Sequence, residues 1–362
     1  MTSGARRRQV RGTAGTLALV ESPVQLLNVL EWAHTQPAVP EPGDTGAVTV
    51  VVLPPRDPAS RGQLQRMTRL ARAEGHEVLW REARGAVAAA RTTARLARRL
   101  RRAHRLVIGD PFSRCLQLLL ATAGPRRVVV VDDGTATMEF LGRVGRGAPL
   151  VRWHRAAPRG PRAALFAPVA RRAVRRLSPS AGRSVEVFTA MPVEGPAGMR
   201  VTANAFGWTR ARFGPPRLSA GADLVGTSLV ETGVIREDRY LAAVTELARR
   251  DGATRYFAHR REGAAKLRRI AEEAGLEVVR PELPLELVAR RGPVAARLLS
   301  FPSTVVHTLP LVLGDTPAVI AVCDIPEDWF TDRASPRAGG FLAAVSSTAR
   351  GAHVLRSPPD PQ

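Results

Sequence analysis

Short, largely apolar runs alternate along the chain with longer stretches in which apolar residues recur every three or four positions. Residues 16–20, 47–53 and 128–131 are rich in valine and leucine, which is typical of strands covered on both faces of a parallel sheet. Residues 24–33 and 86–103 have the spacing of helices with one apolar face. Strands and helices in this alternation predict β-α-β units around parallel sheets.

The alternation weakens in the middle of the chain and restarts after residues 207–220, where Gly214-Pro215-Pro216 is typical of an interdomain linker. A chain of 362 residues is also too long for one small core. We therefore predict an α/β protein with two Rossmann-like domains and a cleft between them. The predicted parts are a basic tail, a first domain, the linker, a second domain and a final tail: residues 1–15, 16–206, 207–220, 221–350 and 351–362.

This outline is that of the GT-B glycosyltransferases, and it is equally the outline of many two-domain nucleotide enzymes, so architecture alone leaves the function open. Charge adds a second observation: the formal net charge is +22, and Lys266 is the only lysine among the 54 basic residues. Such a balance suits a polyanionic partner, namely nucleic acid, an anionic membrane or an acidic glycan. A compositional bias towards arginine on solvated helix faces explains it equally well.

Nucleic acid is disfavoured among these partners, because no base-stacking aromatic residues lie between the arginines and no nucleic-acid-binding motif is present. The two cysteines, Cys115 and Cys323, form neither a disulfide framework nor a metal motif, which favours a reducing, cytoplasmic setting. The apolar run 17–20 is too short for a signal peptide, and no run approaches the roughly 20 residues of a membrane span. Contact with the inner face of the membrane stays open.

The first candidate site is Asp132-Asp133-Gly134, directly after the run 128–131. Ligands of parallel sheets bind beyond the carboxyl ends of the strands. Successive side chains point in opposite directions, so one carboxylate of the pair is expected in the cleft, where it can take a proton from a sugar hydroxyl. The alternative is a loop aspartate that caps the following helix.

The second domain offers His259 at the end of a predicted strand, followed by Arg260 and a second arginine. An imidazole beside guanidinium groups suits a phosphate, although a lone histidine in a loop is more often plain surface. Ser303 and Thr304 open a predicted helix, and the free N–H groups of a helix start bind anions, a role that is compatible with simple capping. Glu286, at another loop-to-helix junction, can accept hydrogen bonds from ribose hydroxyls or complement the helix dipole.

The chain contains no zinc motif, no Walker loop and no Gly-x-Gly-x-x-Gly fingerprint. The adjacent pair Asp132-Asp133 also lacks the Asp-x-Asp spacing that holds a metal in many glycosyltransferases. We therefore predict a reaction that needs neither a metal ion nor a bound cofactor.

The order of these motifs resembles the bacterial sialyltransferases, including the capsular polysialyltransferases: Asp-Asp-Gly, then a histidine at a strand end, then Pro-x-Glu, then Ser300 and the pair Ser303-Thr304. The segments 21–28 and 226–231, the second of which begins Gly226-Thr227, are similar to the same families. The match is scattered over residues 17 to about 325. The family motif His-Pro is His259-Arg260 here, so the rigid turn after the histidine is absent.

The resemblance implies a GT-B fold and a single inverting displacement that moves a sialic acid, or a related nonulosonic acid, from a CMP-activated donor to a glycan or glycolipid acceptor. Asp132 would be the general base, with Asp133 positioning or replacing it, and His259 would stabilise the leaving phosphate. Ser303 and Thr304 would bind that phosphate and Glu286 the ribose, while Ser300, Arg260, Gly226 and Thr227 would complete the donor site.

Two other classes of function stay open. One is a different nucleotide-sugar enzyme on the same plan, either a transferase of UDP- or GDP-linked sugars or an epimerase. The other is a non-enzymatic protein that binds polyanions. The predicted helix 161–177, which carries arginines beside an apolar stripe, is where an anionic acceptor or a membrane would bind, unless its arginines are only solvated surface.

Overall fold

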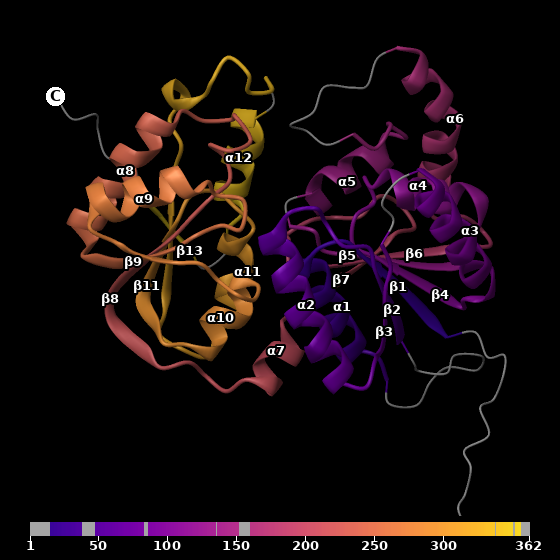
Figure 1. Cartoon of the computed structure of the whole chain (residues 1–362), viewed down its shortest axis with the longest axis horizontal. Coiled ribbons are helices and arrows are strands. Elements are labelled where there is room, and N and C mark those ends of the chain that lie inside the picture. Colours follow the sequence, from indigo (N-terminus) through magenta and orange to yellow (C-terminus); the bar gives the residue numbers. More distant parts are fainter. Residues whose placement is uncertain are drawn as a thin grey trace, which may run out of the picture.

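The computed structural model describes residues 15–37, 48–82, 86–134, 136–151, 160–336, 338–349 and 352–355. The described chain forms two α/β halves that lie side by side, each with helices on both faces of a parallel sheet (Figure 1). The predicted tail 1–15 falls outside the described residues except for Gly15, as does the end of the chain from residue 356.

The first domain is built on a seven-stranded sheet with the order β3-β2-β1-β4-β5-β6-β7, whose strand pairs are all parallel. Its strands are β1 (Thr16–Val20), β2 (Val48–Val52), β3 (Glu77–Trp80), β4 (Arg105–Ile108), β5 (Arg127–Val131), β6 (Ser184–Thr189) and β7 (Arg200–Ala203). Its helices are α1 (Pro23–His34), α2 (Pro58–Ala73), α3 (Ala86–Arg102), α4 (Arg114–Thr122), α5 (Ala136–Gly145) and α6 (Pro161–Arg176).

Strand β5 shows why the valine run predicts a central strand. Val129 and Val131 are buried in the core that contains the side chains of α1 and α2. Val128 and Val130 are buried in the opposite core, which contains side chains of α3, α4, α5 and α6. Because alternate residues enter different cores, both faces of the strand must be apolar, and its carboxyl end is held rigidly in the middle of the sheet.

The chain passes between the sheets through residues 204–217, which include the short helix α7 (Gly207–Arg212). The Glu31 carboxylate of α1 accepts hydrogen bonds from the backbone N–H groups of Trp208 and Thr209, each at 2.9 Å, and thereby caps α7. The segment 204–217 between the two sheets is therefore bound to the first domain through the buried Glu31 carboxylate.

The second domain has a six-stranded parallel sheet with the order β10-β9-β8-β11-β12-β13. Its strands are β8 (Leu218–Val225), β9 (Ala253–Phe257), β10 (Glu277–Val279), β11 (Val294–Ser300), β12 (Val319–Cys323) and β13 (Ala352–Leu355). Its α-helices are α8 (Glu237–Asp251), α9 (Ala264–Ala274), α10 (Leu285–Arg291), α11 (Val305–Val312) and α12 (Ala338–Ser347).

Besides helix α7 in the predicted linker, three strands differ from the sequence-based expectation. Strand β8 begins inside the predicted linker, β7 was not expected, and β13 lies in the predicted C-terminal tail, where it pairs with β12. Strands β7 and β13 are four-residue edge strands with one sheet neighbour each, so they lack the continuous apolar run that marks a strand buried on both faces.

The two domains contact each other beside the cleft. The Gln63 side chain of α2 donates a 2.6 Å hydrogen bond to the carbonyl of Pro281, and Arg66 forms a 2.8 Å ion pair with Glu282. One apolar cluster also contains residues of both domains, among them Leu287 and Leu309 of the second. These contacts bring the carboxyl ends of both sheets to the same cleft.

Candidate active site between the two domains

A cavity of about 450 Å³ lies where the carboxyl ends of the two sheets meet. The first domain contributes residues that follow β1, β2, β4 and β5, and the second contributes the loops after β8, β9, β10 and β11. Of the ten residues singled out from the sequence, eight line this cavity: Asp133, Gly226, Thr227, His259, Arg260, Glu286, Ser303 and Thr304. The cavity therefore unites loops from distant parts of the chain, with Asp133 and Thr304 as one such pair.

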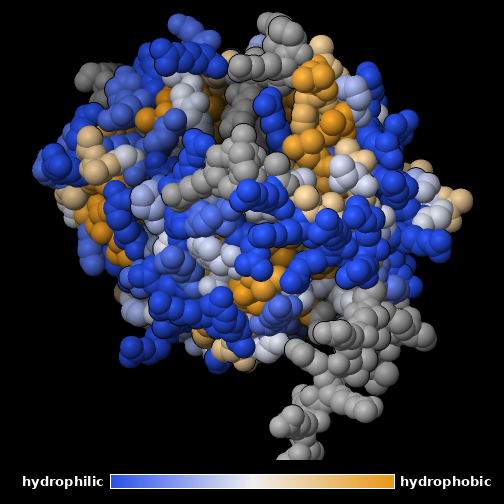
Figure 2. Space-filling view, turned by 45° about the vertical axis from the view of Figure 1, so that its right-hand side comes forward, coloured by the Kyte–Doolittle hydropathy of each residue, from blue (hydrophilic) through white to orange (hydrophobic). Residues whose placement is uncertain are grey.

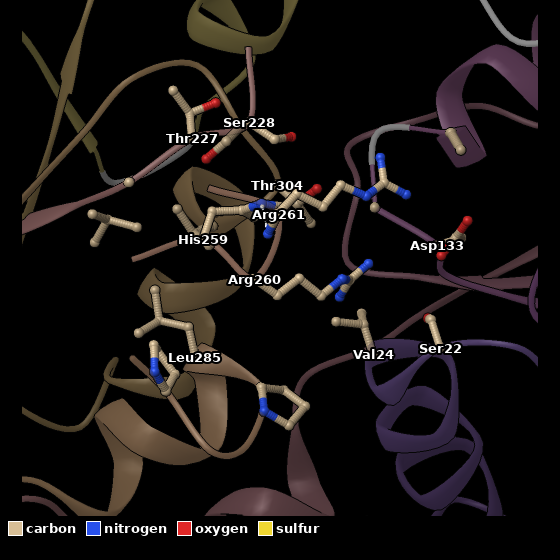
Figure 3. Close-up of a pocket in the computed structure, with 18 of the residues that line it drawn as sticks. Ser22, Val24, Asp133, Thr227, Ser228, His259, Arg260, Arg261, Leu285 and Thr304 are labelled. Carbon is tan, nitrogen blue, oxygen red and sulfur yellow. Dashed lines mark hydrogen bonds between the residues drawn. The ribbon is translucent and has the colours of Figure 1, made fainter. Parts of the chain in front are cut away.

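Asp133 belongs to the first wall of the cavity and lies opposite the loop that carries Arg260 and Arg261 (Figure 3). Its backbone N–H donates to the Thr137 hydroxyl at 3.4 Å, at the start of α5. The adjacent Asp132 is not part of the cavity lining. One carboxylate of the pair therefore reaches the cleft, as the alternation of side chains predicts, and it is Asp133.

Asp132 instead points into the first domain, where only 2% of it is exposed. Its carboxylate accepts hydrogen bonds from the Thr189 hydroxyl at 2.5 Å and from the Ala190 N–H at 2.6 Å, both at the end of β6. Burial raises the pKa of Asp132 to about 6, against the lowering effect of these hydrogen bonds. The resemblance makes Asp132 the general base, but in the structure its carboxylate points away from the cavity.

The loop of the aspartate pair is also fixed by α1. The Asn28 amide donates to the Asp132 carbonyl at 3.0 Å, and the Asn204 amide donates in turn to Asn28 at 3.0 Å. The segment 21–28 and the Asp-Asp-Gly motif, which the resemblance treats as separate features, are thus joined through one buried hydrogen-bond chain. This chain fixes the direction in which Asp133 leaves the sheet.

Gly134 completes the motif with a conformation that other residues rarely adopt, since its φ is +71°. A Cβ at this position would also collide with the hydroxyl of Thr304, across the cleft. Glycine is therefore needed both for the turn and for the close approach of the two domains beside the cavity.

Arg260 and Arg261 extend from the β9–α9 loop across the cavity (Figure 3). Burial lowers the pKa of Arg260, as does Arg261, whereas the carboxylates of Asp133, Glu286 and Asp57 raise it. No hydrogen bond links the Arg260 guanidinium to another described residue. A cation in this position, with its donors directed into a cavity, is suited to a multiply charged anion such as a phosphate.

His259 stands beside these arginines. Its Nδ1 accepts a 3.2 Å hydrogen bond from the Arg261 N–H, so a neutral imidazole carries its proton on Nε2. Burial lowers the pKa of His259 to about 3, and the charges of Arg260, Arg261 and Lys266 contribute in the same direction. At neutral pH, His259 is thus a hydrogen-bond donor through Nε2 and not a cation.

The loop of His259 rests on a buried polar cluster. Glu262 accepts the His259 N–H at 2.5 Å and the Tyr256 hydroxyl at 2.6 Å, and its carboxylate lies 2.8 Å from the Lys266 ammonium. The Tyr240 and Tyr256 hydroxyls are 2.6 Å apart. Gly226 packs against this cluster so closely that a Cβ would overlap Glu262 and Tyr256.

Lys266 connects the cluster to the β8–α8 loop, and only 3% of it is exposed. Its ammonium donates to the Thr227 carbonyl at 3.3 Å, pairs with Glu231 at 3.0 Å and lies 4.8 Å from the centre of the Tyr240 ring. In a chain that uses arginine at 53 of 54 basic positions, the only lysine therefore occupies a compact buried site that holds two cavity loops together.

Helix α11 begins at the cavity with Ser303 and Thr304. No side chain caps this helix start, so capping by Ser303, one of the two roles considered from the sequence, is not seen. Ser300 is not part of the cavity lining: it is buried at the end of β11, with its hydroxyl donating to the Phe301 carbonyl at 2.9 Å and 3.3 Å from the Ser303 hydroxyl. Ser300 therefore contacts Ser303 from the protein interior and not from the cavity.

Glu286 lies in the first turn of α10, at the cavity, and is otherwise buried. Its carboxylate accepts the Thr308 hydroxyl at 2.8 Å, which joins α10 to α11. Burial raises the pKa of Glu286, while the bond from Thr308 and the charge of Arg260 lower it. A buried carboxylate at a cavity is suited to accept hydroxyl groups of a ligand.

Several cavity residues were not singled out from the sequence. They are Gln25, Asp110, Glu139, Ser228 and Arg261, of which Gln25 and Ser228 lie in the segments 21–28 and 226–231 and Arg261 directly follows Arg260. The position of each just beyond a predicted strand was the available signal, since ligands bind at carboxyl ends. In the described residues, no group of three or more histidine, cysteine, aspartate or glutamate side chains could hold a metal ion. Metal independence stays a prediction.

Solved structures share this two-domain fold. An α/β-galactoside α-2,3-sialyltransferase from Photobacterium phosphoreum matches with a TM-score of 0.50 at 8% identity, over 95% of this chain and 99% of that one. A candidate UDP-N-acetylglucosamine 2-epimerase from Listeria monocytogenes matches with a TM-score of 0.51 at 10% identity, over 94% and 92%. An E. coli heptosyltransferase, at 14% identity over 95% and 93%, has a TM-score of 0.40, too low to support any inference.

No protein-family model and no curated protein sequence matches the chain. Identities this low establish the fold alone, and the fold is shared by a transferase and an epimerase. The predicted fold class is confirmed: the chain has two Rossmann-like α/β domains in the GT-B arrangement.

Proposed function

We propose that the protein is an inverting, metal-independent glycosyltransferase that moves a sialic acid, or a related nonulosonic acid, from a CMP-sugar to a glycan or glycolipid acceptor. One observation carries the proposal: a single cavity sets the Asp133 carboxylate on one wall against His259, Arg260 and Arg261 on the other. This arrangement can activate a hydroxyl on one side and hold a phosphate leaving group on the other.

In the proposed reaction the acceptor hydroxyl loses its proton to Asp133, and its oxygen forms the new bond to the anomeric carbon. The bond from that carbon to the donor phosphate oxygen breaks, and its electron pair leaves with CMP. Attack from the side opposite the phosphate inverts the configuration. The role of base, which the resemblance assigns first to Asp132, passes to Asp133 because only Asp133 lines the cavity.

The second domain would bind the donor. Arg260 would pair with the phosphate, and His259 would donate to it through Nε2–H. Ser303, Thr304 and the uncapped start of α11 would complete the phosphate site, since free N–H groups at a helix start favour anions. Glu286 would accept the ribose hydroxyls, and Gly226 and Thr227 would line the donor pocket.

Arg260 occupies the position where the sialyltransferase motif has proline. Its side chain reaches into the cavity, so the loss of a rigid turn is accompanied by the gain of a cation. The turn itself is held instead by the Glu262 carboxylate on the His259 N–H. The proposal therefore does not require the proline.

The cysteines Cys115 and Cys323 are both unpaired, which supports a reducing compartment, and we propose that the enzyme works in the cytoplasm. Among the described residues, no helix is long and apolar enough to cross a membrane.

A thermal-shift screen with CMP, UDP, GDP and NAD tests the donor class, because a ligand that binds the native state raises the unfolding temperature. We expect CMP to give the largest shift. A larger shift with UDP or GDP would contradict the CMP proposal and favour another nucleotide-sugar enzyme on this fold. DNA binding at physiological salt without any nucleotide shift would favour a polyanion-binding protein. NMR of the product from a CMP-sugar and an acceptor then reports the anomeric configuration.

A further inference from the structure

Three neighbouring helices of the first domain carry arginines and no acidic residue. Helices α3, α4 and α6 pack in that order, and none contains aspartate or glutamate. The exposed arginines of this arginine face are Arg91, Arg95, Arg98, Arg99, Arg101, Arg102, Arg114, Arg171, Arg172 and Arg175. Within the described part of the chain, none of them has a carboxylate partner. The face therefore concentrates positive charge that the protein itself does not neutralise.

On other helices of the chain, arginines pair with acidic residues of the same helix. On α8, Arg249 pairs with Glu246 at 2.8 Å, and on α9, Arg269 pairs with Glu273 at 2.6 Å. A general bias towards arginine would give exposed helices of both domains similar patterns. The unpaired arginines of α3, α4 and α6 therefore need a local explanation, and the missing acidic residues point to an anionic partner.

The arginine face also holds the two large hydrophobic side chains that are exposed in the described chain. Leu165 of α6 is 82% exposed, and Leu118 of α4 is 39% exposed. Beside them, the Arg114 guanidinium lies 5.5 Å from the centre of the Phe166 ring. Helix α6 projects at the outer end of the first domain, and Figure 2 shows an apolar strip there, bordered by hydrophilic residues.

We propose that this face binds the surface of an anionic lipid bilayer. The arginines would pair with lipid phosphates, and Leu165 and Leu118 would enter the boundary between headgroups and acyl chains. A hydrated acidic glycan would satisfy the arginines, but it offers no apolar environment to an exposed leucine. A second copy of the chain, bound through the same face, would bring two positively charged surfaces together, and these would repel each other. The bilayer is the partner that matches both the charge and the apolar strip.

This inference goes beyond the proposed transfer reaction and does not depend on it. The face lies on the helices that cover one side of the first sheet, whereas the cavity lies at the carboxyl ends of the strands. Binding through α6 would hold the first domain, which carries Asp133, next to a membrane. A lipid-linked acceptor would then reach the acceptor wall of the cavity without leaving the bilayer.

Flotation of the full chain with vesicles tests the proposal. Vesicles of phosphatidylcholine with phosphatidylglycerol should carry the protein, vesicles of phosphatidylcholine alone should not, and binding should weaken as salt rises. The variant Arg171→Gln/Arg172→Gln/Arg175→Gln should lose on the order of 100-fold in affinity. The variant Leu165→Gln should lose about tenfold. The control Arg249→Gln/Arg268→Gln, which removes two arginines at exposed positions of the second domain, should bind as the parent does.

Equal binding to both kinds of vesicle, or unchanged binding by the triple arginine variant, would overturn the proposal. An unchanged affinity of Leu165→Gln together with equally tight binding to a soluble acidic polysaccharide would also overturn it, in favour of a glycan-binding face. Because all substituted side chains are exposed, thermal melts of the variants should overlay with the parent. CMP-dependent thermal shifts of the same variants report on the donor site separately.

Discussion

The two walls of the cleft are built from the same kind of β-α unit, yet they carry opposite charges. The wall of the first domain presents carboxylates that follow three different strands: Glu21, Asp110, Asp133 and Glu139. The wall of the second domain presents His259, Arg260 and Arg261, together with an uncapped helix start. Glu286 is the acidic exception on the second wall, where burial and Thr308 hold it in place.

In the glycosyltransferase proposed above, the two walls would carry two different chemical tasks. A general base for the acceptor has to be a proton acceptor such as a carboxylate, and a phosphate site has to offer cations or N–H groups, so the two tasks favour opposite charges on the two walls. Each wall also rests on a buried partner that fixes it. Asp132 supports the acidic wall through Thr189 and Ala190, and Lys266 supports the basic wall through Glu262 and Thr227.

The largest expected effect removes the chemistry of the acidic wall. Asp133→Asn should lower kcat by about 10²–10⁴, because one general base is lost, while the CMP-induced thermal shift is unchanged. Asp132→Asn is the matched control and should cost less activity, since Asp132 does not reach the cavity. Steady-state kinetics of both variants decide between the two aspartates. The reverse ranking would return the role of base to Asp132.

Removing the support of the basic wall should lower stability. Lys266→Met leaves the buried Glu262 carboxylate without its ammonium partner, and breaking such a pair costs about 3–5 kcal/mol in free energy of unfolding. Arg268→Met, at an exposed position of the same helix, should change stability by less than about 0.5 kcal/mol. Urea unfolding measures both. Equal stability of the two variants would mean that the Lys266 cluster does not hold the loops.

The support of the acidic wall should show itself in the pH dependence of stability. The pKa of Asp132 is about 6 in the folded protein and about 3.9 unfolded, so the folded state binds more protons between these values. This contribution is fully present below pH 4 and is lost as pH rises to about 6, amounting to about 3 kcal/mol. In Asp132→Asn, this loss of stability between pH 4 and pH 6 should be absent. Only the pH dependence of stability that comes from the other buried carboxylates should remain.

Urea unfolding at a series of pH values measures the difference between the parent and Asp132→Asn. If the two curves stay parallel from pH 4 to pH 7, the carboxylate of Asp132 has an ordinary pKa. Asp132 would then lie in a more polar site than its buried contacts indicate.

The basic wall itself is tested by Arg260→Gln, which removes the charge and keeps a shorter, polar side chain. We expect the affinity for CMP to fall about tenfold, because a charge-assisted hydrogen bond to phosphate is lost. Cytidine, which has no phosphate, should bind the parent and the variant equally. Isothermal titration with both ligands makes the test. An equal loss for cytidine would show that Arg260 shapes the pocket and does not bind the phosphate.

The smallest expected effect is that of metal removal. Activity should survive excess EDTA, because deprotonation of the acceptor by Asp133 and the cations of the opposite wall are proposed to carry the reaction. Transfer assays with and without chelator check this. A loss that Mg²⁺ or Mn²⁺ restores would mean that the carboxylates of the first wall serve as metal ligands, and the contrast between the walls would need a different explanation.

Much of the fold was predictable because strands buried on both faces require continuous apolar runs, as in β1, β2 and β5. The edge strands β7 and β13 escaped prediction because they lack that requirement. The candidate donor residues were predictable to the extent that they follow strands or open helices. The same reasoning could not decide whether Asp132 or Asp133 points into the cleft. Successive side chains point in opposite directions, so a shift of one residue in the loop would exchange the two aspartates.

The sequence by itself determined the alternation of strands and helices, the two-domain α/β plan and the loops in which chemical groups collect, because hydrophobic periodicity and strand ends are local features. Only the tertiary structure decided which aspartate reaches the cleft, since Thr189, Ala190 and Asn28, far away in the chain, fix the loop. It also decided that Lys266 is a buried support and that the arginines of three helices form one face. These properties depend on which distant elements pack together, and no local pattern records that.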